Sequence, residues 1–454
     1  MQKIYAFVLN IVYKEIIKID ERIRTGILFL CGLFMISIYF FWPKSIDKTP
    51  GNIMLVGSII VSIMIVFSIN KTMEMIRWNS ILYYSFTLFG LGILLIGMLH
   101  SVGDGYVLYA LDLSILFPAL YFVWNNRGDY DTLYKLLSFG VLIEGIISYL
   151  YCFYLASKGA LAIEEGRVAG YKWNVNYLAM LGVVILLCSL YLLLIMSHNK
   201  ACIIAASLGV GIGIAYAIIS VSRTAMLTEL VCITVFIVFL VKMVRAGSMN
   251  LRCAIPILVL ALIIAGIAVF AGMQLNDIHY RAVHAAETSE TPTPEATTED
   301  VTDPQALPAE ETDEVKAISE RINSSGDADS YSSGRVVIWK IYLSHSTMLG
   351  RPFKELEPDL AYAAETRAHN NIVEYFYRCG FLVGGIYVIF FFAAMFTGIK
   401  MFFSKTYYQP MDAFLVMVIG AYSIYAMLEI STLPFMRIIP YLFFMTIAPI
   451  FRKE

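Results

Sequence analysis

The sequence of 454 residues has little charge and lacks the patterns that carry soluble nucleotide chemistry. Charged residues make up only 15% of it, hydrophobic residues make up 59%, and mean hydropathy is +0.72. There is no GxGxxG after a strand, no P-loop and no HExxH, so a soluble nucleotide-binding protein is not indicated. The net charge of −2 gives no reason to expect a nucleic-acid partner.

Cysteine is present only in positions that suggest packing. The seven cysteines form no CxxC pair and no His/Cys cluster, and all lie in or beside apolar runs. We therefore expect buried thiols, no disulfides, no metal and no cofactor. The N-terminus also lacks the pattern of a cleavable signal peptide. Residues 1–24 are amphipathic with mixed charge, which is typical of a segment on the cytoplasmic membrane surface.

Long apolar runs are what the sequence has in abundance. Runs of about 18 or more apolar residues are typical of transmembrane helices, so we predict an all-α polytopic membrane protein. Nine spans lie within 25–273 and three within 371–454. The predicted spans are 25–42, 52–70, 80–99, 106–124, 135–157, 176–196, 202–220, 225–246, 254–273, 371–399, 413–430 and 438–451.

The basic residues of the short loops indicate the orientation. With the N-terminus inside, the inner segments hold seventeen Lys and Arg, and the short outer loops hold seven. Cytoplasmic loops normally carry this excess, so both termini are predicted in the cytoplasm and 274–370 outside. Within the outer segment, 285–325 is acidic and of low complexity, which predicts disorder. Ser332 to Asn370 regains apolar residues at helical spacing.

This topology gathers ionisable residues at the outer face, where positive charge is normally depleted. Each has a plain structural explanation, as a surface ion pair, a snorkelling side chain or a helix start. As a group they suggest a site, because guanidinium groups bind diphosphates bidentately and histidine suits proton transfer near neutral pH. The residues are Arg167, Arg223, Arg335, His369 and Arg437.

Further candidates lie beside these residues in the sequence. Asn370 and Asn371 follow His369 directly and can cap a helix start or hydrogen-bond sugar hydroxyls. Trp173 can anchor in the membrane interface or face a sugar. Arg367 is a further candidate for phosphate binding.

Acidic residues inside the predicted spans carry the main competing hypothesis. In a polysaccharide flippase or another secondary transporter, Asp112, Glu144 and Glu229 would be the coupling sites. A third alternative is a scaffold in envelope assembly, with the acidic stretch as its binding tail. Glu374 and Arg378 are spaced i,i+4 and are expected to pair with each other inside the bundle.

The order and sidedness of these motifs resemble the O-antigen ligase and O-antigen polymerase superfamily. The likeness extends over most of the chain, from about twelve spans to a large late external loop. The acidic stretch at 287–320 is not part of the family pattern and is interpreted as an insertion. The matching motifs are Arg167 before an Asn-bearing span start, Ser222-Arg223 between two spans, Ser333-Gly334-Arg335 with Trp339, His369-Asn370 running into a span, and Arg437 in the last external turn.

The resemblance implies an integral-membrane glycosyltransferase of the GT-C type in the bacterial inner membrane. Such an enzyme takes a glycan from an undecaprenyl-diphosphate carrier outside the cytoplasm and passes it to a sugar hydroxyl, with inversion and without a metal. The acceptor is a lipid-linked repeat unit in an O-antigen or capsule polymerase, our first hypothesis, and lipid A–core in a ligase. A polymerase can also have a chain-length regulator protein as partner. His369 would act as base and Arg223, Arg335 and Arg437 would hold the diphosphate, with Arg167 and Arg367 as second choices.

Overall fold

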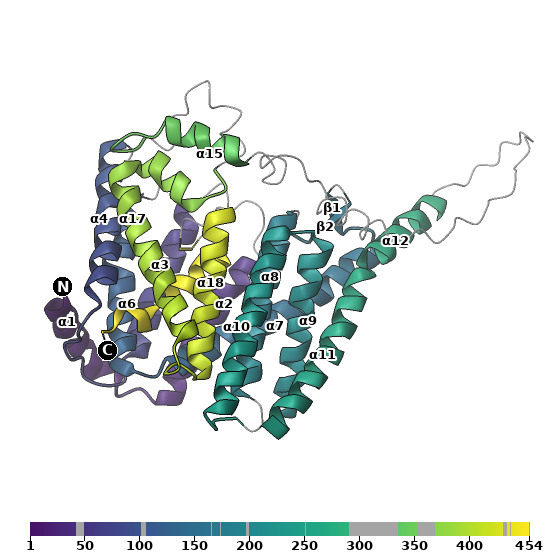
Figure 1. Ribbon diagram of the computed structural model, residues 1–454, viewed down its shortest axis with the longest axis horizontal. Helices are drawn as coiled ribbons and strands as arrows, with labels where there is room; N and C mark the ends of the chain where they lie inside the picture. Colours follow the sequence, from purple (N-terminus) through teal and green to yellow (C-terminus); the bar gives the residue numbers. More distant parts are fainter. Residues whose placement is uncertain are drawn as a thin grey trace, which may run out of the picture.

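The computed structural model describes 1–41, 50–100, 106–164, 166–172, 174–196, 199–249, 251–289, 335–351, 368–429, 434–435 and 437–453. In these residues, long helices stand side by side in a bundle, and a short helix, α15, lies across one end of it (Figure 1). Ten helices of the described part are long and apolar enough to cross a membrane. The chain is therefore a polytopic all-α membrane protein, apart from a small antiparallel hairpin of β1 and β2.

The helices and strands follow the apolar runs closely. A π-helical turn at Asp112–Leu116 joins α5 to α6, and a 3-10 turn at Ala448–Phe451 ends the described fold. The elements are α1 (Gln2–Ile16), α2 (Glu21–Phe41), α3 (Pro50–Ser68), α4 (Ser80–His100), α5 (Tyr106–Leu111), α6 (Phe117–Arg127), α7 (Tyr130–Ser157), β1 (Ala162–Glu164), β2 (Arg167–Gly170), α8 (Val175–Ile195), α9 (Lys200–Ile219), α10 (Arg223–Arg245), α11 (Leu251–Met273), α12 (Leu275–Ser289), α15 (Arg335–Ser344), α17 (Asn371–Phe403), α18 (Pro410–Leu428) and α19 (Ile438–Thr446).

Short polar side chains determine where several membrane helices begin. Asn174, Asn199 and Ser222 each accept a hydrogen bond from a backbone N–H three residues later, at 2.9, 3.2 and 3.4 Å. These caps satisfy donors that would otherwise have no partner in the first turn. Such donors are costly in apolar surroundings. The cap at Ser222 makes Arg223 the first residue of α10.

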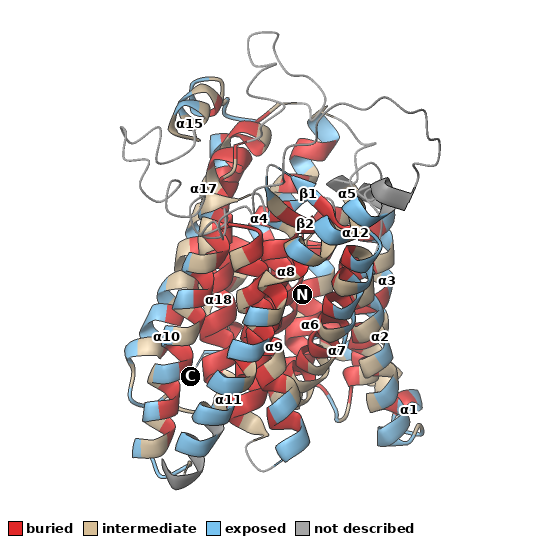
Figure 2. Cartoon of the chain, turned by 90° about the vertical axis from the view of Figure 1, so that its right-hand side faces the viewer, coloured by how far each residue is buried: buried red, intermediate tan, exposed pale blue. Residues whose placement is uncertain are grey.

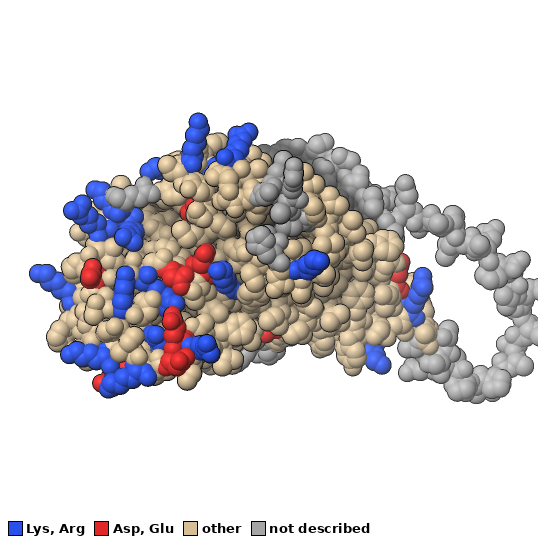
Figure 3. Space-filling model, turned by 90° about the horizontal axis from the view of Figure 1, so that it is seen from below, with Lys and Arg blue, Asp and Glu red and all other residues tan. Residues whose placement is uncertain are grey.

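Basic side chains close helix ends at one end of the bundle, which we call the basic face. Arg24 Nη1 donates to Ile69 O at 2.6 Å, Arg127 Nη1 donates to Ser68 O at 3.3 Å, and Lys242 Nζ donates to Phe402 O at 2.6 Å. Cations are favoured at the C-terminal ends of helices. Figure 3 looks at the bundle from below and shows Lys and Arg side chains over much of this face.

The opposite end of the bundle, which we call the site face, carries the hairpin, α12 and α15 (Figure 1). Two contacts between a side chain and a backbone carbonyl connect α15 and the residues after it to the start of α17 and the end of α4. Trp339 Nε1 donates to Ala368 O at 2.6 Å, and the ring of His100 lies 2.9 Å from Leu349 O. The residues predicted to lie outside therefore share one end of the molecule. The predicted disorder at 285–325 lies outside the described residues beyond Ser289, and α12 is helical up to that point.

Helix α17 is too long for one straight span. Its 33 residues would extend about 50 Å, against a hydrocarbon core of about 30 Å. The helix is broken at Gly380, which has φ +79°. The amide of Phe381 donates instead to Thr347 O at 3.0 Å. The segment before the kink stays at the site face, where Arg378 pairs with Glu374 as predicted.

Among the described residues, ten of the twelve predicted spans correspond to helices that are long and apolar enough to cross a membrane. The stretch Asn52–Ser68 of α3 is apolar but shorter than these ten helices. The predicted final span at 438–451 forms the 9-residue helix α19 and then a 3-10 turn. Pro449 lies in that turn, where its missing N–H and fixed φ do not support a longer α-helix.

Buried residues fill the interior of the bundle, and apolar residues also cover its flanks (Figure 2). Helix α8 is central, and 94% of an 18-residue apolar stretch within it is buried. It crosses α9 at Gly182 and Gly213, where a Cβ on Gly213 would lie 2.7 Å from the Gly182 carbonyl oxygen. Small residues allow membrane helices to approach this closely.

We predict that Gly213→Ala lowers the free energy of unfolding by about 1–3 kcal/mol, because the added methyl group forces α8 and α9 apart. Unfolding of the purified protein in mixed micelles measures the change. Gly266→Ala is the matched control, since nothing lies within 4 Å of its added Cβ. Equal stability of the two variants would show that this crossing does not limit packing.

Candidate functional site

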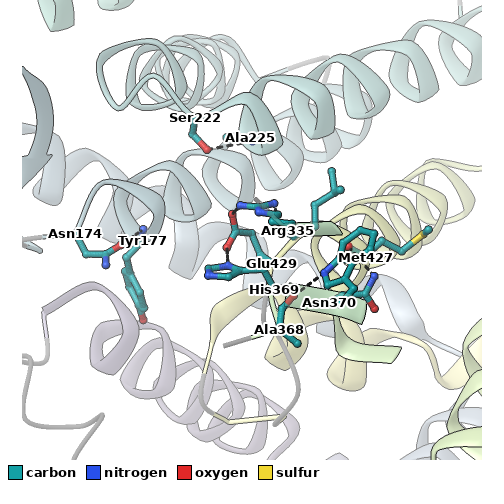
Figure 4. Close-up of polar contacts among 12 residues, drawn as sticks. Asn174, Tyr177, Ser222, Ala225, Arg335, Ala368, His369, Asn370, Met427 and Glu429 are labelled. Atoms are coloured by element: carbon teal, nitrogen blue, oxygen red, sulfur yellow. Dashed lines mark hydrogen bonds and ion pairs between the residues drawn. The ribbon is translucent and has the colours of Figure 1, made fainter. Parts of the chain in front are cut away.

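Glu429 joins two of the residues that the sequence singled out. Its Oε2 lies 3.1 Å from His369 Nδ1, and its Oε1 lies 2.9 Å from Arg335 Nη2. Arg335 also donates to the carbonyl oxygen of Leu428, the last residue of α18. The three side chains come from α15, the start of α17 and the end of α18, and they meet at the site face (Figure 4). We call them the Glu429 triad.

The triad holds a carboxylate ionised in a largely buried place. The side chain of Glu429 is only 14% exposed, and burial alone would raise its pKa. The hydrogen bond to His369 and the charge of Arg335 outweigh burial, so the pKa of Glu429 is lowered. Each carboxylate oxygen of Glu429 accepts from one partner, and this holds the carboxylate in one orientation.

One ring nitrogen of His369, Nδ1, is bound to Glu429. A carboxylate only accepts hydrogen bonds, so Nδ1 is the nitrogen that carries hydrogen, and Nε2 of the neutral ring is left with a lone pair. The side chain is 29% exposed, so a substrate can reach it. The backbone of His369 has φ +49°, and Trp339 holds the preceding carbonyl at 2.6 Å.

The two asparagines after His369 have structural partners. Asn370 Oδ1 accepts from the amides of Ile372 and Val373, which caps α17, and its Nδ2 donates to Met427 O at 3.0 Å. Asn371 is fully buried, and its Nδ2 lies 3.4 Å from the hydroxyl of Tyr387. The hydrogen bond from Asn370 to Met427 connects the start of α17 to the end of α18, next to the contact between His369 and Glu429.

Arg223 starts α10 after a strained turn. Val221 has φ +49°, which is a rare conformation for a β-branched residue. Arg167 Nε donates to Ser220 O at 2.8 Å and so supports this turn. Helix α10 packs against α18, and Figure 4 shows its Ser222 cap beyond Arg335 and Glu429.

Strain is concentrated at this face. In the part of the chain that the structure describes, Val221 and His369 are the non-glycine residues with positive φ. One precedes Arg223 by two residues and the other is the candidate base. Residues in sparsely populated backbone regions cost about 1–3 kcal/mol each and are concentrated at functional sites. The two turns therefore point to the same place as the charges.

Arg437 belongs to a second cationic cluster at the same face. Its guanidinium carbon lies 4.9 Å from the ring centroid of Tyr177, and Lys172 Nζ lies 5.1 Å from the same centroid. Burial, together with the charge of Arg437, lowers the pKa of Lys172 to about 7. Two cations beside one half-buried ring form a place that an anion would stabilise. We call Lys172, Tyr177 and Arg437 the Tyr177 cluster.

The structure therefore joins His369 with Arg335 through Glu429, and Arg167 supports the turn before Arg223. Arg437 belongs to the Tyr177 cluster, and Figure 4 draws Tyr177 in the same view as the triad. The remaining candidates, Trp173 and Arg367, lie outside the described residues.

Three contributing residues were not identified from the sequence. Glu429 ends an apolar run and lies within the predicted span 413–430, although an ionisable residue at that position is itself a signal of function. Lys172 and Tyr177 flank Trp173 in the sequence, but their partner Arg437 lies far along the chain. Only packing reveals these neighbours.

The acidic residues of the transporter hypothesis lie in separate helix interfaces. Asp112 accepts from Ser58 of α3 at 2.7 Å, and Glu144 of α7 accepts from the hydroxyl of Ser37 in α2. Glu229 lies 3.6 Å from the Cβ position of Gly182, at the crossing of α8 with α9 and α10. These contacts give no common coupling site.

Comparison with known proteins adds no assignment. No protein-family model matches this chain, and no curated protein matches it. Among the described residues, no three His, Cys, Asp or Glu side chains come together as a candidate metal site.

A double-mutant cycle on Arg335 and Glu429 tests the triad. We expect Arg335→Ala and Glu429→Ala each to destabilise the protein, and a coupling of about 1–3 kcal/mol between them, because they share a partly buried ion pair. The free energy of unfolding in micelles is the quantity to measure. Additive effects would mean that the contact contributes nothing, and Lys18→Ala with Glu15→Ala, an exposed pair, is the control.

Proposed function

We propose that the chain is an integral-membrane glycosyltransferase. It transfers a glycan from an undecaprenyl-diphosphate-linked donor to a sugar hydroxyl on the extracytoplasmic side of a bacterial inner membrane, as an O-antigen or capsule repeat-unit polymerase of the GT-C type. The observation that carries this proposal is the Glu429 triad at the end of the bundle opposite the basic face.

The sidedness of the triad supports an extracytoplasmic reaction. Positive residues are normally enriched on the cytoplasmic side of a membrane, and here they cap helix ends at the basic face. The triad would then lie outside the cytoplasm. No nucleotide sugar is available there, so the donor has to carry its own leaving group, and a lipid diphosphate fits that requirement.

In the proposed reaction, His369 removes the proton of the attacking hydroxyl. Glu429 accepts the hydrogen bond from Nδ1, so Nε2 has the lone pair that receives the proton. The acceptor oxygen forms a bond to the anomeric carbon while the bond from that carbon to the diphosphate oxygen breaks. The resulting imidazolium is stabilised by the carboxylate beside it. General base catalysis of this kind is typically worth about 100- to 10,000-fold.

The leaving diphosphate takes the bonding electrons and needs cations near it. Arg223 and the Tyr177 cluster supply them in this proposal, with the guanidinium groups binding phosphate oxygens in pairs. Each preorganised cation can supply on the order of 3–4 kcal/mol to the transition state. The resemblance implies that Arg335 also holds the diphosphate. Its contact with Glu429 at 2.9 Å makes positioning of the carboxylate its first role, and Arg167 supports the turn before Arg223.

A ligase would use the same residues and differs only in its acceptor. Polymerase remains the first hypothesis because divergent polymerases are more numerous than ligases. The surface glycan of a deletion strain distinguishes the two. Loss of a polymerase leaves single repeat units on the acceptor, whereas loss of a ligase leaves polymer on the carrier lipid. The transporter hypothesis is disfavoured, since Asp112, Glu144 and Glu229 lie in separate interfaces.

We predict that His369→Ala and Arg223→Ala each abolish glycan transfer, because one removes the base and the other removes a phosphate ligand. The measurement is the polymer length of surface glycan in cells that express each variant at the level of the unchanged protein. Lys340→Ala, on the exposed side of α15, should leave the polymer unchanged. Near-normal polymer with either site variant would remove that residue from the mechanism.

The pH dependence of diphosphate binding tests the Tyr177 cluster. The pKa of Lys172 is lowered to about 7, so its positive charge is present below that pH and is lost as the pH rises through it. We expect affinity for inorganic diphosphate to fall between about pH 6 and 8. Lys172→Arg should remove this fall, because arginine keeps its charge. An identical pH profile for both proteins, measured by calorimetry, would contradict the assignment.

A further inference from the structure

An apolar groove runs between α8, α9, α10 and α11, away from the Glu429 triad. Its volume is about 580 Å³, and Arg245 is its charged lining residue. Helix α11 packs mainly against α9, which lies between α10 and α11 in the view of Figure 1. Other lining residues include Ile233, Ile237 and Leu262.

The groove opens towards the membrane. Leu262 is 73% exposed and Ile237 is 50% exposed, although both lie within helices that cross the bilayer. Side chains in such positions contact lipid. The groove is therefore accessible from the bilayer without any rearrangement of the bundle.

The depth of the groove matches one leaflet. Along α10 its lining runs from Ile233 to Arg245, which is about 18 Å at 1.5 Å per residue. Half of a bilayer core is about 15 Å. Since Arg245 ends α10 at the basic face, the groove begins there and ends near the middle of the membrane. A phospholipid acyl chain fits this length.

Arg245 is placed to contact the headgroup of such a lipid. Lys242, one turn earlier, donates to the carbonyl oxygens of Phe402 and Ser404 at 2.6 and 2.7 Å. The side chain of Arg245 has no hydrogen bond or ion pair to any residue that the structure describes, and the residue is exposed. A guanidinium group at the mouth of an apolar groove is complementary to a phosphate that carries an acyl chain.

We propose that this groove is a binding site for an anionic phospholipid from the leaflet at the basic face. One acyl chain lies between α10 and α11, and the headgroup phosphate contacts Arg245. The site does not depend on the proposed glycosyl transfer. A carrier lipid bound there would have its diphosphate at the end of the bundle opposite His369, so the occupant is a structural lipid rather than the donor.

Native mass spectrometry of the delipidated full-length protein tests this site. The probes are dioleoyl phosphatidylglycerol and dioleoyl phosphatidylcholine, which share their acyl chains and differ in net charge. We expect the protein to retain the anionic lipid more strongly, on the order of fivefold. Arg245→Gln should remove the preference, and Arg22→Gln, on an exposed basic residue at the start of α2, should keep it.

A second variant tests the groove itself. Ile237→Trp fills the groove from its lip and should reduce the retention of both lipids while Arg245 is intact. Equal retention of the two lipids by the unchanged protein would overturn the proposal, as would an unchanged preference in Arg245→Gln. Displacement of phosphatidylglycerol by undecaprenyl diphosphate would also overturn it, because the carrier would then be the occupant.

Discussion

The arrangement of the site depends on one constraint, that a carboxylate held mostly out of water must be paired. Glu429 ends a membrane helix and is largely buried, so it is stable as an anion only with His369 and Arg335 beside it. That requirement brings the start of α15, the start of α17 and the end of α18 to one point. It also fixes Nδ1 of His369 as the nitrogen that donates a hydrogen bond, which leaves the lone pair of the neutral ring on Nε2. The cap by Asn370 and the hydrogen bond from Trp339 serve the same placement.

Much of the fold could be predicted from the sequence, because a bilayer requires long apolar helices and tolerates little else. The helices of the bundle follow the predicted runs, and the candidate residues share one end because span parity determines which end each loop occupies. Hydrophobicity did not predict the lengths of two helices, because single residues determine where those helices end or break. Pro449 limits the length of the α-helix in the last apolar run. Gly380 breaks α17, and the amide of Phe381 then donates to the carbonyl oxygen of Thr347 in the preceding loop. Neither effect changes the hydrophobicity of these runs, which is the property used to predict the spans.

The site could be predicted only in part. His369 and the arginines were identifiable because ionisable groups are rare at the outer ends of apolar runs. Glu429 was absorbed into a predicted span, and its partners come from segments 60 and 94 residues away. Lys172 and Arg437 both lie against the ring of Tyr177. Pairing of this kind is set by how helices pack, and no spacing within the sequence encodes it. The hydrogen bond from Asn370 to Met427 and the contact of Asn371 with Tyr387 also depend on packing, and sugar binding by either asparagine stays a prediction.

The most direct measurement is transfer by the purified protein in vesicles, with an undecaprenyl-diphosphate-linked oligosaccharide as the substrate and mass spectrometry of the products. Glu429→Gln keeps the size of the side chain and removes the charge that directs His369. We expect the unchanged protein to lengthen the glycan and Glu429→Gln to do so at least about 100-fold more slowly, with donor binding retained. No lengthened product from the unchanged protein, or equal rates for both proteins, would contradict the proposed role of the Glu429 triad.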